Sequence, residues 1–138
     1  MAQYRFSAQV ISRGSGRSAI AAAAYRSGST LIDKRTGWIH DFGRRHGVVS
    51  AEIIAPDNAP DWMLDREQLW NAVEQVETRS NAQLAREIQF SLPHELTDDE
   101  RRELLHSFVR EHFVSVGMIA DVAIHAPDKD GDARNHHA

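Results

Sequence analysis

Apolar and polar residues alternate over residues 4–11, which predicts an opening β-strand. Tyr4, Phe6, Ala8 and Val10 share one face of this strand, because side chains two apart point the same way. Further strands are predicted over residues 48–55, 85–92 and 118–126. His136-His137-Ala138 would begin one more strand, which is incomplete at the end of the sequence.

Three helices are predicted between these strands, each from a capping signal. Ser18 is a suitable N-cap and Gly28 a suitable C-terminal glycine for a short Ala-rich helix. Asp65 with Gln68 predicts the start of a second helix, and Thr97 opens a capping box for a third, which we expect to end at Gly117. The apolar stripes of the second and third helices consist of Leu69, Val73 and Val76, and of Leu104, Leu105, Phe108 and Val109.

This order of elements predicts an α+β fold in one domain over residues 1–138, with helices on one face of a largely antiparallel sheet. The other face of the sheet should be polar and lined by small residues. It would carry Glu87, Asp121 and His125, and we expect the chemistry there. Residues 29–47 are polar and basic, and we expect a loop with a short hairpin through Trp38 and Phe42.

Charge is divided unevenly along the chain, although the net charge is only −4. Residues 1–50 hold eight lysines and arginines against two aspartates, a net charge of +6. Residues 51–138 hold eight basic and eighteen acidic side chains, a net charge of −10. Because phosphate binding depends on local cations, the basic segment is compatible with a polyanionic ligand, or it is a solvated basic loop.

Composition excludes several classes of protein. No apolar run is long enough to cross a bilayer, and the first residues lack the pattern of a signal peptide, so membrane insertion is not expected. With no cysteine, the chain has neither disulfides nor thiolate metal sites, which fits a cytoplasmic location. Any metal site must use histidine and carboxylate.

Tyr25 closes the Ala-rich helix and is a candidate nucleophile. A tyrosine on such a helix usually anchors the edge of a core. Ser18, Ala21 and Ala22 share its face, however, and residues this small would let a backbone approach closely. A phenol needs a nearby cation or base to attack a phosphodiester, and a metal ion on the phosphate oxygens would supply the required charge.

His125 and His137 are the candidate metal ligands. They flank a polar turn, and antiparallel pairing of the flanking segments would bring their imidazoles close enough to share a metal ion. The alternatives are a partly exposed strand histidine and a frayed chain end. A third ligand is needed, and the matching strand position is 139, beyond the sequence. Glu87 is either an acceptor that orients a ligand histidine or a surface glutamate.

These parts together resemble the N-terminal nicking domain of conjugative plasmid relaxases of the MobA/MobL type, whose metal site contains two histidines flanking a hydrophobic residue. The resemblance covers essentially the whole sequence. It rests on the order and spacing of Tyr4-Arg5-Phe6, Ser18 to Tyr25, Ala85-Arg86-Glu87-Ile88, Asp121 to His125 and Asn135-His136-His137-Ala138.

The resemblance implies that Tyr25 attacks one phosphodiester at an origin of transfer, keeps the 5′ end as a phosphotyrosine and releases a 3′ hydroxyl. It implies that Glu87 matches an acidic position of the family motif. His125 and His137 match two of three ligands to a divalent metal ion (Mn, Mg, Ni or Zn). The third histidine and any helicase or primase region would lie past Ala138, so we expect a C-terminally truncated relaxase domain.

The implied partner is single-stranded DNA at an origin of transfer, with accessory relaxosome proteins and a coupling protein, in the bacterial cytoplasm. Trp38 and Phe42 could stack on bases, but burial under the loop is the expected arrangement. Two other readings stay open: a non-catalytic module that binds single-stranded nucleic acid, and an inert fragment with an exposed sheet edge. The candidate phosphate contacts are Arg26, Lys34, Arg35, Arg44 and Arg45.

Overall fold

A computed structural model describes residues 5–138, and Tyr4 of the predicted first strand lies outside the described residues. The chain divides into two compact units. The histidine unit comprises Met1–Ser7, Gly47–Ala59 and Gln89–Ala138, and the tyrosine unit comprises Ala8–His46 and Pro60–Ile88. Each unit has its own hydrophobic core.

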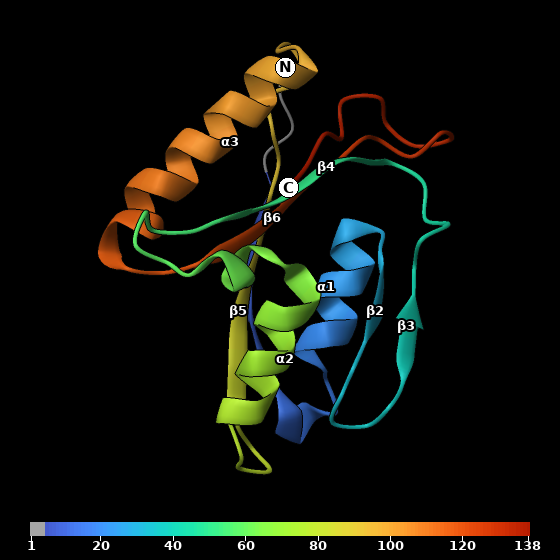
Figure 1. The fold of residues 1–138 in the computed structure, drawn as a ribbon. Helices are drawn as coiled ribbons and strands as arrows, with labels where there is room; N and C mark the ends of the chain where they lie inside the picture. The colour runs from blue at the N-terminus through green and yellow to red at the C-terminus, as the bar shows by residue number, and fades with distance from the viewer. Residues whose placement is uncertain (1–4) are drawn as a thin grey trace. The chain divides into compact units, whose positions relative to one another are not determined.

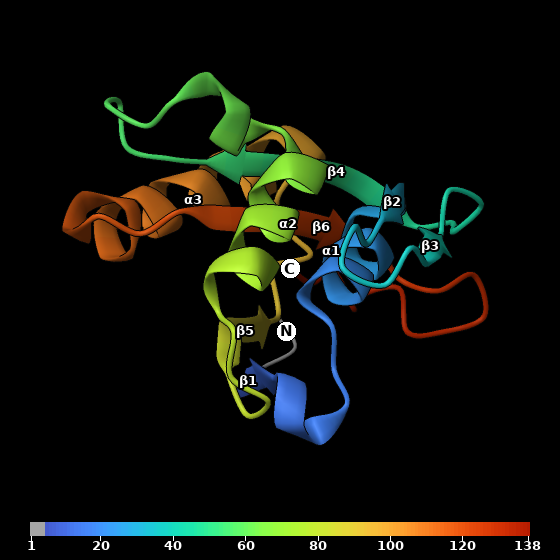
Figure 2. The same cartoon turned by 60° about the horizontal axis from the view of Figure 1, so that its bottom comes forward.

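The tyrosine unit is built on two helices that lie side by side, α1 and α2 (Figures 1 and 2). Ser18 caps the first helix by accepting a hydrogen bond from the amide of Ala21, and Gly28 ends it in the left-handed region at φ 65°. Asp65 caps the second through the amide of Gln68. The bounds are α1 Ala19–Ser27, α2 Arg66–Val76, β2 Thr30–Ile32, β3 Ile39–Asp41 and the 3-10 turns Arg13–Ser15 and Asp61–Leu64. The strands β1 Phe6–Ser12 and β5 Gln83–Phe90 lie mostly in this unit, and their residues 6–7 and 89–90 belong to the histidine unit.

Small residues on α1 allow close packing in the core of this unit. Ile20 and Ala24 are fully buried against Leu31 of β2, and Ala19 packs with Ile11 and Leu84. Trp70 of α2 contacts both clusters and joins them. Each large aliphatic side chain buried in this way contributes about 1.5–3 kcal/mol, so α1 is held by its inner face.

Buried polar groups of α2 fix the elements around it. The Glu74 carboxylate accepts hydrogen bonds from the Ala19 amide at 3.0 Å and from the Arg13 guanidinium at 2.8 Å. The Ala19 amide belongs to the first turn of α1, where amides have no partner within the helix. Asn71 donates to the carbonyl of Ile32 and accepts from the amide of Lys34, which ties the β2–β3 hairpin to α2.

The histidine unit consists of an antiparallel pair of strands, β4 and β6, with α3 packed against β4 (Figure 1). Thr97 and Glu100 form the predicted capping box at the start of α3. Leu105 and Val109 of this helix pack against Ile54, Leu92 and Ile124 to form the core. The bounds are β4 Val48–Ile54, β6 Ala120–His125, α3 Asp98–His112 and the 3-10 turn Val114–Val116.

The α+β class and the antiparallel pairing are confirmed. Pairing is distributed over three two-stranded sheets, β1–β5, β2–β3 and β4–β6. The hairpin predicted within residues 29–47 is β2–β3, with Leu31 paired with His40. In the described part of the chain, no helix has the length and apolar character needed to cross a membrane.

Several details of the predicted apolar faces are wrong. Val76, the last residue of α2, is 78% exposed, whereas Asn71 and Glu74 of the same helix are buried. In β1 it is Ile11 that is buried, while Val10 is exposed, because α1 and β5 pack on the face of Ile11.

The third helix also departs from its prediction. It ends at His112, before the 3-10 turn that leads to Gly117. Leu104 and Phe108 of its predicted stripe are partly exposed. The buried Arg101 instead donates to the carbonyls of Pro93, His94 and Leu96, so this turn of the helix holds the preceding loop.

Candidate functional site

Tyr25 lies on the last turn of α1 with 43% of its surface exposed, so its ring is accessible rather than buried in the core. The Phe42 ring meets it edge-on, with 5.3 Å between centroids. The Arg45 guanidinium lies over the ring at 4.0 Å from its centroid, and Arg26 lies at 5.5 Å. Both distances are within the range of cation–π attraction. Two guanidinium groups therefore flank the phenol within the tyrosine unit.

Glu87 of β5 binds two arginines of the same unit. Arg26 reaches both carboxylate oxygens at 3.3 Å, and Arg17 reaches one of them at 3.5 Å. Burial would raise the pKa of Glu87, but the hydrogen bonds and charges of Arg26 and Arg17 outweigh it and hold the pKa below its ordinary value of 4.5. Glu87 is therefore a carboxylate at neutral pH, and its partners in the tyrosine unit are arginines.

The lowered pKa of Glu87 predicts an acid-dependent loss of stability. A carboxylate whose pKa is lower in the folded state stabilises the fold above pH 4.5, its ordinary value, and this stabilisation is lost as the pH falls through the folded pKa. We expect Glu87→Gln to lower the free energy of unfolding by about 1 kcal/mol at neutral pH, because both arginines are partly exposed.

Urea denaturation of wild type and Glu87→Gln at pH 7 and at about pH 3 measures this difference. The two proteins should converge in acid. A difference that persists unchanged at the lower pH would show that Glu87 stabilises the fold by packing and not by its charge.

The remaining candidate phosphate contacts have different surroundings. Arg35 is half-exposed, with its Nε 3.7 Å from the Glu74 carboxylate. Lys34 and Arg44 are exposed on the segment that contains the β2–β3 hairpin and the turn after it. Trp38 was expected to be buried under the loop, but it is 70% exposed just before β3. Phe42 is half-buried against Tyr25.

His125 and His137 pair in the histidine unit as the sequence predicts. The amide of each donates to the carbonyl of the other, at 2.7 and 3.1 Å, and their ring centroids lie 5.1 Å apart. The chain also returns to β5, where Ala138 and Phe90 exchange two backbone hydrogen bonds of 3.0 Å. The pairing shows that the segment after the polar turn is not a frayed end.

The surroundings of the two imidazoles differ. His125 is buried, with 4% of its surface exposed, which corrects the alternative of a partly exposed strand histidine. His137 has Nδ1 3.1 Å from the carbonyl of Asn135. A carbonyl can only accept, so Nδ1 is the donor in this contact, and in the neutral imidazole Nε2 then has the lone pair that a metal ligand requires.

Two imidazoles this close fit a divalent metal ion as two of its ligands. Among residues 5–138, no group of three or more histidine, cysteine, aspartate or glutamate side chains is arranged to hold a metal ion. Tyr25 and Glu87 belong to the tyrosine unit, and His125 and His137 to the histidine unit. The convergence of these two groups on one phosphate stays a prediction.

Comparison with known proteins assigns the family. The sequence model of the MobA/MobL family matches residues 17–138, a range that contains Tyr25, Glu87 and both histidines. The mobilization protein MobL of Acidithiobacillus ferridurans is 46% identical over 127 residues, which cover 92% of this chain and 33% of MobL. The conjugal transfer protein TraA of Agrobacterium fabrum is 38% identical over 146 residues, covering 99% of this chain and 13% of TraA.

Two further relatives agree. The probable mobilization protein MobA of Bifidobacterium longum is 37% identical over the whole of this chain, which spans 24% of that protein. A solved structure from work on the molecular basis of vancomycin resistance transfer in Staphylococcus aureus is 36% identical, with a TM-score of 0.88 over 99% of this chain and 67% of that one. The chain thus spans a third or less of the three curated relatives, and it belongs to the MobA/MobL family.

Proposed function

We propose that this chain nicks one strand of DNA at a plasmid origin of transfer, as the relaxase domain of a conjugative mobilization protein. The observation that carries the proposal is the exposed ring of Tyr25, with the guanidinium groups of Arg45 and Arg26 at 4.0 and 5.5 Å from its centroid, on a helix that the family match covers. Names of relatives that refer to mobilization and conjugal transfer support the same role.

In the proposed reaction the Tyr25 oxygen attacks the phosphorus of one phosphodiester. The bond from phosphorus to the 3′ oxygen breaks, the phenol loses its proton, and the leaving oxygen gains one to become a 3′ hydroxyl. The 5′ phosphate stays on Tyr25 as a phosphotyrosine ester. This ester retains the energy of the broken phosphodiester bond, so the step can reverse. Glu87 enters the proposal through its ion pairs with Arg26, on the last turn of α1, and with Arg17, just before the start of α1.

A divalent metal ion belongs to the proposal, held by His125 and His137 with a further ligand. When bound, the ion would stabilise negative charge on the non-bridging phosphate oxygens. Nδ1 of His137 donates to Asn135 and so orients Nε2 toward a ligand role, while the backbone pairing fixes the spacing of the two rings. Of the candidate ions Mn, Mg, Ni and Zn, imidazole ligands suit Ni and Zn best, whereas Mg and Mn prefer oxygen ligands.

The proposed substrate is single-stranded DNA. Exposed Lys34 and Arg44, together with Arg35, would contact phosphates, and exposed Trp38 offers a ring on which a base can stack. Arg26 and Arg45 would act next to the phenol. Accessory relaxosome proteins and a coupling protein are the proposed partners, in the bacterial cytoplasm.

End-labelled DNA tests the proposal. Single-stranded oligonucleotides tiled across the DNA next to the coding gene are incubated with Mn²⁺ or Mg²⁺ and resolved on a denaturing gel. The protein is assayed as residues 1–138 and in a form extended past Ala138. Because the proposed step leaves the 5′ phosphate of the downstream fragment on Tyr25, a label at the 3′ end of the oligonucleotide should move with the protein. A label at the 5′ end should appear on a shorter free strand.

The outcomes separate the three readings. A sequence-dependent adduct with the 3′ label supports nicking, and oligonucleotides of scrambled sequence are the control. Binding without an adduct in both forms would mean a non-catalytic module for single-stranded nucleic acid. Absence of binding together with a broad, non-cooperative thermal transition would mean an inert fragment.

A further inference from the structure

We propose that Arg45 is a positioning residue for Tyr25: it holds the phenol ring in one orientation on the last turn of α1. This inference rests on the proposed function and assigns Arg45 a role other than a phosphate contact. The geometry behind it lies entirely within the tyrosine unit.

Arg45 contacts Tyr25 at two places. Its guanidinium lies over the ring at 4.0 Å from the centroid, and its Nη1 donates to the Tyr25 carbonyl at 2.5 Å. That carbonyl is one of the last four of α1, which have no amide partner farther along the helix. A cation is also favourable at this negative end of the helix dipole. One side chain therefore binds both the backbone and the ring of the same residue.

The backbone around Arg45 is held in place independently of Tyr25. The amide of Phe42 donates to the Ser29 carbonyl at 3.1 Å, and the amide of Arg45 donates to the Phe42 carbonyl at 3.0 Å. Asp41, at the end of β3, accepts from Thr30 of β2 and from the amide of Gly43. The turn after β3 thus brings Arg45 back to the end of α1.

A half-exposed tyrosine needs such restraint if it is a nucleophile. With 43% of its surface exposed, the Tyr25 ring has only part of a packed environment to select its rotamer. Phe42 contacts the ring edge-on and Arg45 covers a face, so the two restrict rotation in different directions. In-line attack depends on the direction of the phenol oxygen, and small misalignments cost rate steeply.

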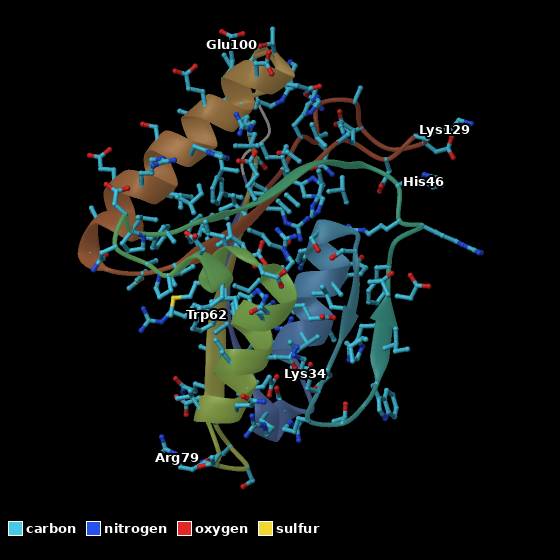
Figure 3. All side chains as sticks on the ribbon, viewed as in Figure 1. Lys34, His46, Trp62, Arg79, Glu100 and Lys129 are labelled. Carbon is cyan, nitrogen blue, oxygen red and sulfur yellow. The ribbon has the colours of Figure 1, made fainter. Side chains whose placement is uncertain are left out.

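The test compares Arg45→Ala and Arg45→Lys with Arg79→Ala. Arg79 is an exposed arginine in the turn between α2 and β5 (Figure 3), so its variant removes one charge from the same unit at a place outside the proposed site. Adduct formation is measured against DNA concentration. We expect Arg45→Ala to lower the rate at saturating DNA by about tenfold, with a smaller change in the concentration for half-maximal rate. Arg45→Lys should recover part of the rate, and Arg79→Ala should match wild type.

A second measurement does not depend on nicking. The chain has two tyrosines, so ring-labelled tyrosine in a Tyr4→Phe background gives NMR signals from Tyr25 alone. These signals should shift in Arg45→Ala and stay in place in Arg79→Ala. If Arg45→Ala fails to fold, as judged by its thermal transition, Arg45→Lys provides the same comparison because it keeps the charge and loses the planar contact.

Two results would overturn the proposal: unshifted Tyr25 signals in both Arg45 variants, or a loss of affinity with an unchanged saturating rate, which would make Arg45 a phosphate contact. Failure of the proposed function has a different signature, since wild type itself would then form no adduct. In that case the Tyr25 signals decide whether Arg45 holds the ring, a shift supporting the restraint and its absence refuting it.

Discussion

Tyr25→Phe is expected to abolish the covalent protein–DNA adduct, reducing its rate of formation by a factor of about 10³ or more. The substitution removes the one oxygen that would attack the phosphodiester. It keeps the ring that packs against Phe42 and the carbonyl that accepts from Arg45. Affinity for single-stranded DNA and the thermal transition should therefore stay close to wild type.

The matched control is Tyr4→Phe, which changes the other tyrosine of the chain. It should form adduct at the wild-type rate. Gel analysis of labelled DNA with both variants assigns the linkage to one side chain. An adduct that survives Tyr25→Phe, or disappears in Tyr4→Phe, would refute Tyr25 as the nucleophile.

Glu74→Ala is expected to lower the free energy of unfolding by about 3–5 kcal/mol, because it breaks a buried ion pair by removing one partner. The Glu74 side chain is 1% exposed, and its carboxylate binds the Arg13 guanidinium at 2.8 Å and the Ala19 amide at 3.0 Å. The variant would leave Arg13 with no carboxylate at this position and the Ala19 amide without its acceptor. A loss of this size is comparable to the whole stability of a marginal domain.

Urea denaturation of Glu74→Ala, Glu74→Gln and Gln75→Ala measures this effect. Glu74→Gln keeps an acceptor for the Ala19 amide and should lose less stability. Gln75 is the exposed neighbour on α2, and its substitution should change stability by less than about 0.5 kcal/mol. A loss below about 1 kcal/mol for Glu74→Ala would mean that α1 is held by its apolar face alone.

Elements with a strong local signal were predictable from the sequence. The Ser18 and Gly28 caps and the Thr97 capping box occur where the sequence places them, because capping depends on side chains within a few residues of each other. The pairing of His125 with His137 was also predictable, because a short polar turn leaves few other arrangements for the strand before it and the segment after it. The accessible position of Tyr25 agrees with its place on a helix of small residues.

Features that depend on distant neighbours were not predictable. Val76 matches the helical period of Leu69 and Val73, yet 78% of its surface is exposed at the end of α2. Trp38 was expected to be buried, but in the connection between β2 and β3 its side chain is exposed. Periodicity says which residues share a face but not whether another element covers it.

By itself, the sequence determined the α+β order of elements, their caps and the pairing across the final turn, and it named the candidate residues for the chemistry. All of these depend on groups close together along the chain. Only the tertiary structure decided which arginine pairs with which carboxylate and which arginine lies over the tyrosine ring. Glu87 binds Arg17 and Arg26, Glu74 binds Arg13, and Arg45 covers Tyr25, through contacts that link residues 20 or more positions apart. The position of a charged residue in the sequence does not say which distant residue it will contact. The packing of the helices and the path of each turn decide these pairs.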